Sequence, residues 1–248
     1  SSVMALAPVL APIAGGMLQS AFGWRSIFFA LVAVGLGGGA VVSLLLPETL
    51  KTRAAEPVSL GSMLASFRVV GRHPVYRAYL AMAATSFAGL FAWISGASFV
   101  LQNLYGLTPI DFGIAFALSA IGYMAGSMMA ARLVVRLGLD RTIGIGSCAL
   151  TAGGFGMVAS VALGFTSAVS LVVPVAVYLA GLGMVLAQSI AGAMTPFPDR
   201  AGAASSLFGF VQQIMAAACG ALVGWLLGEN AWPVAGAVAF MGTATLLI

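Results

Sequence analysis

Polar and aromatic side chains recur at helical spacing inside a long apolar stretch of this sequence. Phe91, Ser95, Ser98 and Gln102 follow one another at intervals of four, three and four residues, which places them along one face of a helix. Hydroxyl and amide groups on such a face can orient a small ligand by hydrogen bonds, and an aromatic ring can enclose its apolar part. This mixture of side chains is typical of a small-molecule binding site.

Similar faces occur in four other apolar stretches. Their members are Gln19 in the first stretch, Ser119 with Tyr123, Tyr178 with Gly181 and Gln188, and the pair Gln212 and Gln213. An amide inside an apolar helix must find a hydrogen-bond partner, so these faces should point into the protein. A bond between two helices explains any single one of them at least as well as a ligand contact. Their recurrence on five stretches favours a shared polar cavity with a small-molecule substrate.

Residues suited to catalysis or metal binding are scarce. His73, the only histidine, lies between Arg72 and Pro74 with no neighbouring cysteine or carboxylate, and Cys148 and Cys219 occupy separate apolar stretches. Neither arrangement has the spacing of a metal site, a catalytic group or a disulfide framework. We therefore expect no enzymatic activity, no bound metal and no cofactor.

Glycines repeat at four-residue spacing, which indicates close helix packing. The repeats are Gly35 with Gly39, Gly122 with Gly126, and Gly220 with Gly224 and Gly228. None of the glycine-rich segments carries the lysine and following Ser or Thr of a phosphate-binding loop. Packing is therefore the role that we expect for them.

The elements that position these residues must be membrane-spanning helices. Of 248 residues 61% are hydrophobic and 6% are charged, whereas soluble domains have roughly 45–50% and about 25%. A spanning helix needs about 20 apolar residues, and seven blocks reach that length before a shorter eighth. They cover residues 3–21, 26–46, 78–101, 112–131, 142–165, 170–194, 203–227 and 233–248. The sequence predicts an all-α polytopic membrane protein, with the lipid bilayer as its surroundings.

The positions of the charged residues predict orientation rather than a partner. The ten basic residues are scattered between apolar blocks and form no patch with interleaved aromatics, so we expect no nucleic-acid binding. Basic residues are retained on the cytoplasmic side. If the first block runs outward, only Arg25 of the ten is external. No charged residue lies near the middle of a block, where it would indicate an ion or proton pathway.

One long connection, residues 47–77, separates two blocks from the six that follow. Within it, apolar residues share one helical face behind Ser59, which is a plausible N-cap. These residues are Leu60, Met63, Leu64, Phe67 and Val70. A short amphipathic helix on the membrane surface and a solvated linker with one apolar turn explain the pattern equally well.

Prolines and paired glycines interrupt the first block. Pro8, Ala11, Pro12, Gly15 and Gly16 form a candidate conformational motif in this block. Proline removes a backbone hydrogen bond and kinks a helix, which suits either a moving hinge or a static bend.

Residues 11–16 resemble the Gly-Pro-x-x-Gly-Gly antiporter motif in the fifth helix of drug:proton antiporters of the major facilitator superfamily. The stretches 22–28, 46–50, 98–102, 105–109 and 193–198 resemble its bicyclomycin-resistance (Bcr/CflA) branch. The loop 131–143 is similar to the Gly-x-Leu-x-Asp-Arg-x-Gly loop motif. Its charged residues are Arg132, Arg136, Asp140 and Arg141. Ala11 replaces the first glycine of the antiporter motif, and Val135 stands where the loop motif has Asp.

The resemblance implies a major facilitator fold in which the blocks are helices five to twelve of twelve. Residues 1–46 would end the first six-helix half, 47–77 would be the cytoplasmic link, and 78–248 would form the second half with its last helix truncated. We expect the chain to be a fragment of a longer protein in the bacterial inner membrane. The implied activity is export of small amphiphilic drugs in exchange for protons by alternating access, with the site near the membrane midplane. A facilitator or importer of another solute, or a non-catalytic membrane scaffold, is the alternative.

Overall fold

The computed structural model describes residues 11, 14–46, 60–165, 167–228 and 230–248. Throughout these residues the regular secondary structure is helical, and they contain no strand. The predicted all-α architecture is therefore confirmed.

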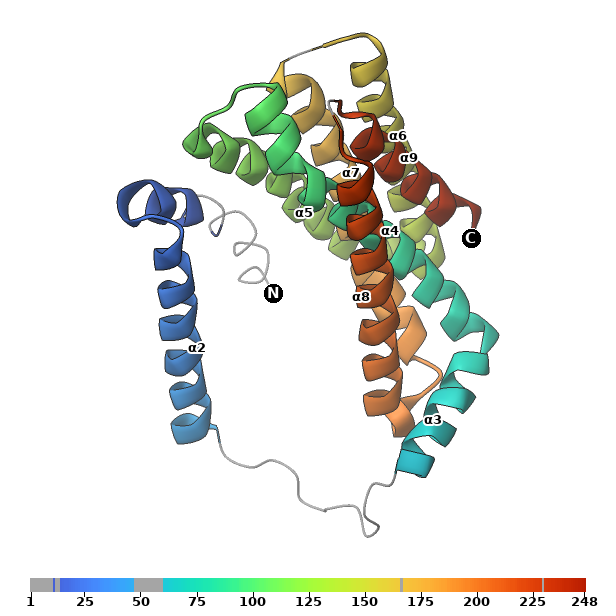
Figure 1. Ribbon diagram of the computed structural model, residues 1–248. Helices are drawn as coiled ribbons and strands as arrows, with labels where there is room; N and C mark the ends of the chain where they lie inside the picture. The colour runs from blue at the N-terminus through green and yellow to red at the C-terminus, as the bar shows by residue number, and fades with distance from the viewer. Residues whose placement is uncertain (1–10, 12–13, 47–59, 166, 229) are drawn as a thin grey trace.

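The helices follow the predicted blocks closely (Figure 1). After helical residues 14–22, the elements are α2 (Arg25–Leu45), α3 (Leu60–Arg72), α4 (Pro74–Ser98), the π-helical η1 (Phe99–Leu104), α5 (Pro109–Leu137), α6 (Leu139–Ala162), α7 (Ala168–Met194), the 3-10 turn η2 (Pro198–Arg200), α8 (Ala201–Leu226) and α9 (Trp232–Leu247). In the part of the chain that the structure describes, six helices are long and apolar enough to cross a membrane, and α9 is a shorter apolar helix.

Turn chemistry sets the boundaries of α5. Thr108 is its N-cap, with a side-chain oxygen that accepts a hydrogen bond from the Asp111 backbone N–H at 3.2 Å, and Pro109 fits the first turn, where no N–H partner is needed. At the other end, Gly138 has a φ of 79°, a conformation that glycine adopts without strain. Because α6 begins at the next residue, this single glycine reverses the chain between two antiparallel helices.

Helices α4 to α9 pack together, whereas α2 lies apart from them (Figure 1). The central helices are α4, which packs against α7, α8 and α9, and α7, which packs against α4, α5 and α6. The main core includes Trp93, Leu101, Leu150 and Leu182. No residue of α2 is buried, so its apolar surface must be covered by lipid or by other membrane helices.

Small residues let α5 and α7 approach at backbone distance. A Cβ built on Gly122 would collide with the carbonyl of Ala176, and one built on Gly126 would collide with that of Ala180. Gly220 has a similar role, because a Cβ there would lie 2.5 Å from Oγ of Ser95. The predicted packing role is confirmed for these three glycines.

The other repeated glycines have no such neighbour within the described structure, and their packing role stays a prediction. A Cβ added to Gly35, Gly39, Gly224 or Gly228 would meet nothing within 4 Å. Their spacing is that of a packing motif, but no described neighbour lies against them. Spacing alone therefore did not distinguish packed from open glycines.

The amphipathic segment of the long connection is a helix, α3. The first of the two interpretations predicted a helix here, and its position on the membrane surface stays a prediction. Val70 is fully buried with Ala204 and Phe208 of α8, and Phe67 is half-buried. Met63 and Leu64 remain 41% and 66% exposed. The proposed cap, Ser59, lies outside the described residues. One end of α3 is thus fixed to α8, while the apolar side chains of its first turns are free to meet a membrane surface.

Candidate functional site

Phe91, Ser95, Ser98 and Gln102 form the face predicted above, which we call the α4 stripe although Gln102 lies in η1. The α4 stripe points away from the interior of the bundle. Ser95 and Ser98 are exposed, and Phe91 and Gln102 are half-buried. Nε2 of Gln102 donates a hydrogen bond to Oγ of Ser98 at 2.7 Å, and Ser95 lies against Gly220 of α8. These polar groups are therefore available on the surface of the described helices rather than consumed in their core.

The C-terminal end of the α4 stripe departs from α-helical geometry. Gln102 lies in η1, where the backbone N–H of Tyr105 reaches the carbonyl of Val100 at 3.1 Å. Such π-helical turns are rare and often occur at functional sites. Sequence spacing assumed a regular α-helix here, and no residue signal in the stretch predicted the wider turn.

Tyr178 has a different environment from the α4 stripe. Its side chain is only 1% exposed, its hydroxyl donates to the carbonyl of Ser86 at 2.9 Å, and its ring lies against Gly89. Because Ser86 and Gly89 belong to α4, this side chain bonds α7 to α4. The sequence left open whether Tyr178 contacts a ligand or bonds two helices, and in the bundle it bonds two helices.

The stripe residues of α4 and α7 also lie at different depths. The contacts of Tyr178 with Ser86 and of Gly192 with Tyr79 show that the two helices are antiparallel. At a rise of about 1.5 Å per residue, Gln188 lies roughly 15 Å from Tyr178 toward one end, and Gln102 lies roughly 20 Å from Gly89 toward the other. The structure therefore does not bring Gln102 and Gln188 together.

Two other candidates, Gln212 and Gln213 of α8, can be placed along α4 from the contacts between the two helices. Ser95 lies level with Gly220, and the hydroxyl of Tyr76 donates to the carbonyl of Ala204 at 2.7 Å, so α4 and α8 run parallel. This register puts Gln212 and Gln213, which are half-buried and exposed respectively, at about the height of Phe87 and roughly one helical turn from the level of Phe91.

Phe87 is a residue that sequence reasoning missed. The Phe87 and Phe91 rings pack with centroids 5.1 Å apart. Its spacing of four residues from Phe91 was a signal that could have found it. Such an aromatic pair can enclose the apolar part of a small amphiphilic molecule.

The remaining predicted site residues are dispersed. Tyr123 is half-buried and packs against the main core, and the buried hydroxyl of Ser119 donates to the carbonyl of Ala115 at 2.9 Å. Gln188 is half-buried and Gln19 is exposed.

The predicted cytoplasmic loop contains one contact that the sequence did not reveal. Asp140, in the first turn of α6, accepts a hydrogen bond from the hydroxyl of Tyr79 on α4 at 2.6 Å. Arg132, Arg136 and Arg141 are exposed. Asp140 therefore links the α5–α6 turn to α4.

The structure describes only part of the proline and glycine motif in the first apolar block, residues 3–21. Ala11 and the pair Gly15 and Gly16 are helical, while Pro8 and Pro12 lie outside the described residues. A Cβ on Gly16 would lie 3.4 Å from the carbonyl of Pro109, at the start of α5, and one on Gly15 would meet nothing within 4 Å. Gly16 is thus the motif residue that approaches another described helix.

In the part of the chain that the structure describes, no three His, Cys, Asp or Glu side chains gather as a metal site would need. His73 instead packs edge to face with Phe197, with ring centroids 5.3 Å apart. Its position between α3 and α4 gives it a packing contact.

Comparison with known proteins identifies the architecture. Residues 1–220 match the family described as the Major Facilitator Superfamily. The chain belongs to this superfamily. The fold and the superfamily resemblance predicted from the motifs are confirmed, and the family is one of membrane transporters with small-molecule substrates.

Several curated relatives of this transporter chain are bacterial proteins named for drug resistance. It is 29% identical to the bicyclomycin resistance protein homolog of Haemophilus influenzae, over 94% of this chain and 58% of the relative. It is 27% identical to multidrug resistance protein D of Escherichia coli, over 84% of this chain and 52% of the relative. A chloramphenicol resistance protein of Pseudomonas aeruginosa is 24% identical over 94% and 55%.

These matches confirm the predicted resemblance to the bicyclomycin-resistance branch. The chain spans between half and three fifths of the length of these relatives. With its candidate membrane spans, this superfamily member is a multi-pass integral membrane protein of the bacterial inner membrane.

Proposed function

We propose that this transporter exports small amphiphilic drugs in exchange for protons by alternating access. The observation that supports this most is the Phe87–Phe91 ring pair on α4, which lies outside the core of the bundle, with Gln212 and Gln213 of α8 at about the height of Phe87. Two aromatic rings and two amides favour ligands with an apolar body and few polar groups. The similarity to proteins named for resistance to bicyclomycin, chloramphenicol and multiple drugs supports the same substrate class.

The division of the chain is part of this proposal. Helices α4 to α9 are the second six-helix half, residues 47–77 are the cytoplasmic link, and α2 with the helix before it ends the first half. The separation of α2 from the bundle supports this division, since its exposed apolar surface would be covered by other helices of the first half. The α4 stripe would then face the first half across a central cavity.

Proton coupling requires an ionisable group that both sides of the membrane can reach in turn. In the described spans the carboxylates Asp111 and Asp140 lie in the first turns of α5 and α6, and Asp199 lies in the turn η2 before α8, so none of the three is at mid-depth. We therefore propose that the coupling carboxylate belongs to the first half, in a region that the relatives possess beyond the match to this chain.

The test is drug efflux from cells that express the full-length protein, measured before and after a protonophore dissipates the proton gradient. Coupled export should cease when the gradient collapses, because uphill transport then has no driving force. Efflux down the drug gradient that continued unchanged would support the facilitator instead. A scaffold would show no protein-dependent efflux in either condition.

The cavity residues are tested by replacing Phe91. Loss of an aromatic contact of about 0.5–1.5 kcal/mol corresponds to roughly a twofold to twelvefold loss of affinity. Phe91→Ala should therefore lower export of some compounds more than others, measured as the change in inhibitory concentration for a panel of drugs.

Phe155→Ala is the matched control, since Phe155 is 55% exposed on α6, away from the α4 stripe. Both variants should reach the membrane in normal amounts. Equal changes in the drug profile for the two variants would contradict the assignment of Phe91 to the substrate cavity.

A further inference from the structure

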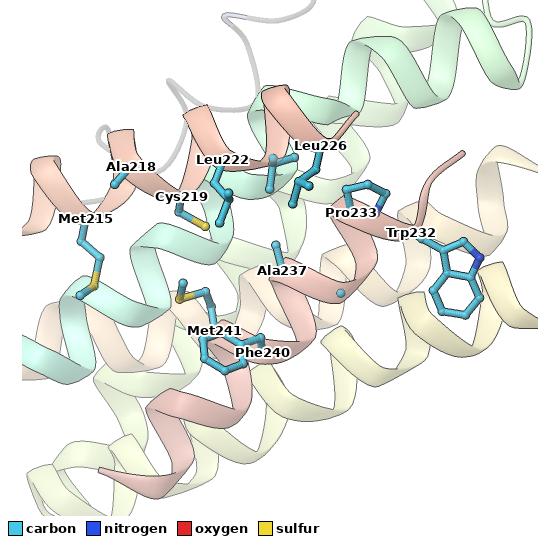
Figure 2. A pocket seen from close by; sticks show the side chains of 12 residues that line it. Met215, Ala218, Cys219, Leu222, Leu226, Trp232, Pro233, Ala237, Phe240 and Met241 are labelled. Carbon is cyan, nitrogen blue, oxygen red and sulfur yellow. The ribbon is translucent and has the colours of Figure 1, made fainter. Parts of the chain in front are cut away.

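A groove of about 530 Å³ lies between α8 and α9 (Figure 2). Helix α8 packs mainly against α4, and α9 packs against α6 and α4, whereas α8 and α9 make little contact with each other, so the space between them stays open. The lining comes from Met215 to Leu226 on α8 and from Trp232 to Met241 on α9, and its side chains are all apolar apart from the Cys219 thiol and the Trp232 indole N–H. The volume falls within the roughly 300–1,000 Å³ range of ligand pockets.

The groove has a mouth at one end of the helices, and its lining ends at the other near the middle of α8. Leu226 and Trp232 lie at the mouth, where α8 ends and α9 begins, and Met215 and Met241 lie at the opposite end (Figure 2). Trp232 is 48% exposed, and tryptophan is enriched where the hydrocarbon meets the headgroups. The mouth is therefore at the level of a membrane surface.

The depth of the groove matches one leaflet. From Trp232 to Met241 a helix rises roughly 14 Å, which is about half of the 30 Å hydrocarbon core. A spanning helix from a second copy would need a contact surface along the whole membrane. A groove that ends near the midplane instead suits a single flexible chain that enters from one surface.

Both the wall and the inner end are suited to such a chain. A Cβ on Gly236 would meet nothing within 4 Å, so this part of the wall is open space. At the inner end, Met215 and Met241 supply unbranched side chains that adapt to a flexible apolar occupant.

We propose that the α8–α9 groove binds one acyl chain of a bilayer lipid. The headgroup lies beside Trp232, the chain runs between the helices past Cys219 and Gly236, and its methyl end reaches Met215 and Met241. This lipid site is separate from the drug cavity proposed above, since its lining shares no residue with the α4 stripe.

The experiment uses the full-length protein in vesicles of phosphatidylethanolamine and phosphatidylglycerol. Two trace phospholipids carry a photoactivatable diazirine, one near the ester and one near the methyl end of an acyl chain. After illumination, labelled peptides are mapped by mass spectrometry. The ester-proximal probe should label around Leu226 and Trp232, and the methyl-end probe around Met215 and Met241.

Gly236→Leu fills the groove without a backbone collision, and it should reduce labelling of both groove segments roughly tenfold. Gly224→Leu is the matched control, because Gly224 is an exposed glycine of α8 whose Cβ would also meet nothing within 4 Å and which does not line the groove. Its labelling should equal that of the unmodified protein.

Several outcomes would overturn the proposal. One is labelling spread evenly over other exposed apolar residues, such as Ile114 and Leu118 of α5. Another is labelling that Gly236→Leu leaves unchanged, and a third is cross-linking of the groove to a second copy of the chain. The dependence on probe position is measured on the unmodified protein, so it tests the site even if a variant fails to fold.

Discussion

Gly126→Leu is expected to prevent assembly of the α4–α9 bundle. A side chain at this position would collide with the backbone carbonyl of Ala180 on α7. A flexible side chain could move aside, but a backbone atom in the middle of a packed helix cannot. The cost should therefore reach at least about 3 kcal/mol, the upper end of the usual range for overpacking. The measurable result is a large fall in the amount of monodisperse protein extracted from the membrane.

Gly224→Leu again serves as the control for Gly126→Leu. It introduces the same side chain on another membrane helix of the bundle, where a Cβ meets nothing within 4 Å. We expect normal yield and a normal thermal unfolding temperature for this variant. If both leucine variants gave equal yields, the close approach of α5 and α7 would not be needed for folding.

Tyr178→Ala is expected to destabilise the protein rather than change its substrate range. The ring is 1% exposed between α4 and α7, and removing a buried aromatic side chain costs roughly 3–5 kcal/mol because a cavity remains. Membrane abundance and thermal stability should both fall. This expectation differs from that for Phe91→Ala, which should leave abundance unchanged.

Tyr178→Phe separates the hydrogen bond from the packing. This variant keeps the ring and loses the bond to the Ser86 carbonyl, at a cost of about 0.5–1.5 kcal/mol. Its unfolding temperature should lie between those of the unmodified protein and Tyr178→Ala. Normal abundance of Tyr178→Ala together with an altered drug profile would contradict the interhelical role. It would favour a substrate contact for Tyr178 instead.

The candidate site was predicted only in part. Helical spacing correctly placed Phe91, Ser95 and Ser98 on one face, because periodicity within one helix is a local property of the chain. It could not show that Tyr178 is enclosed by α4, or that Gln102 and Gln188 lie near opposite ends of their helices. Those facts depend on which helix is the neighbour and on the register between them, and neither is encoded in the spacing within one helix.

Glycine packing illustrates the same limit. Gly122 with Gly126 and Gly35 with Gly39 have identical spacing, yet only the first pair meets a neighbouring backbone in the described structure. In a bilayer the lipid is as apolar as the side chains, so hydrophobicity does not distinguish the packed face of a helix from the lipid face. The sequence supplies the motif, and the arrangement of the other helices determines whether it is used.

By itself the sequence determined that the protein crosses a membrane and approximately which residues form each spanning helix. These properties follow from the length of apolar runs needed to cross the hydrocarbon core and from local turn residues such as Thr108, Pro109 and Gly138. Tertiary structure alone decided the bond of Tyr79 to Asp140, the burial of Tyr178 and the open groove between α8 and α9. The physical reason is that each joins segments far apart in the chain, whose contacts exist only once the helices have packed.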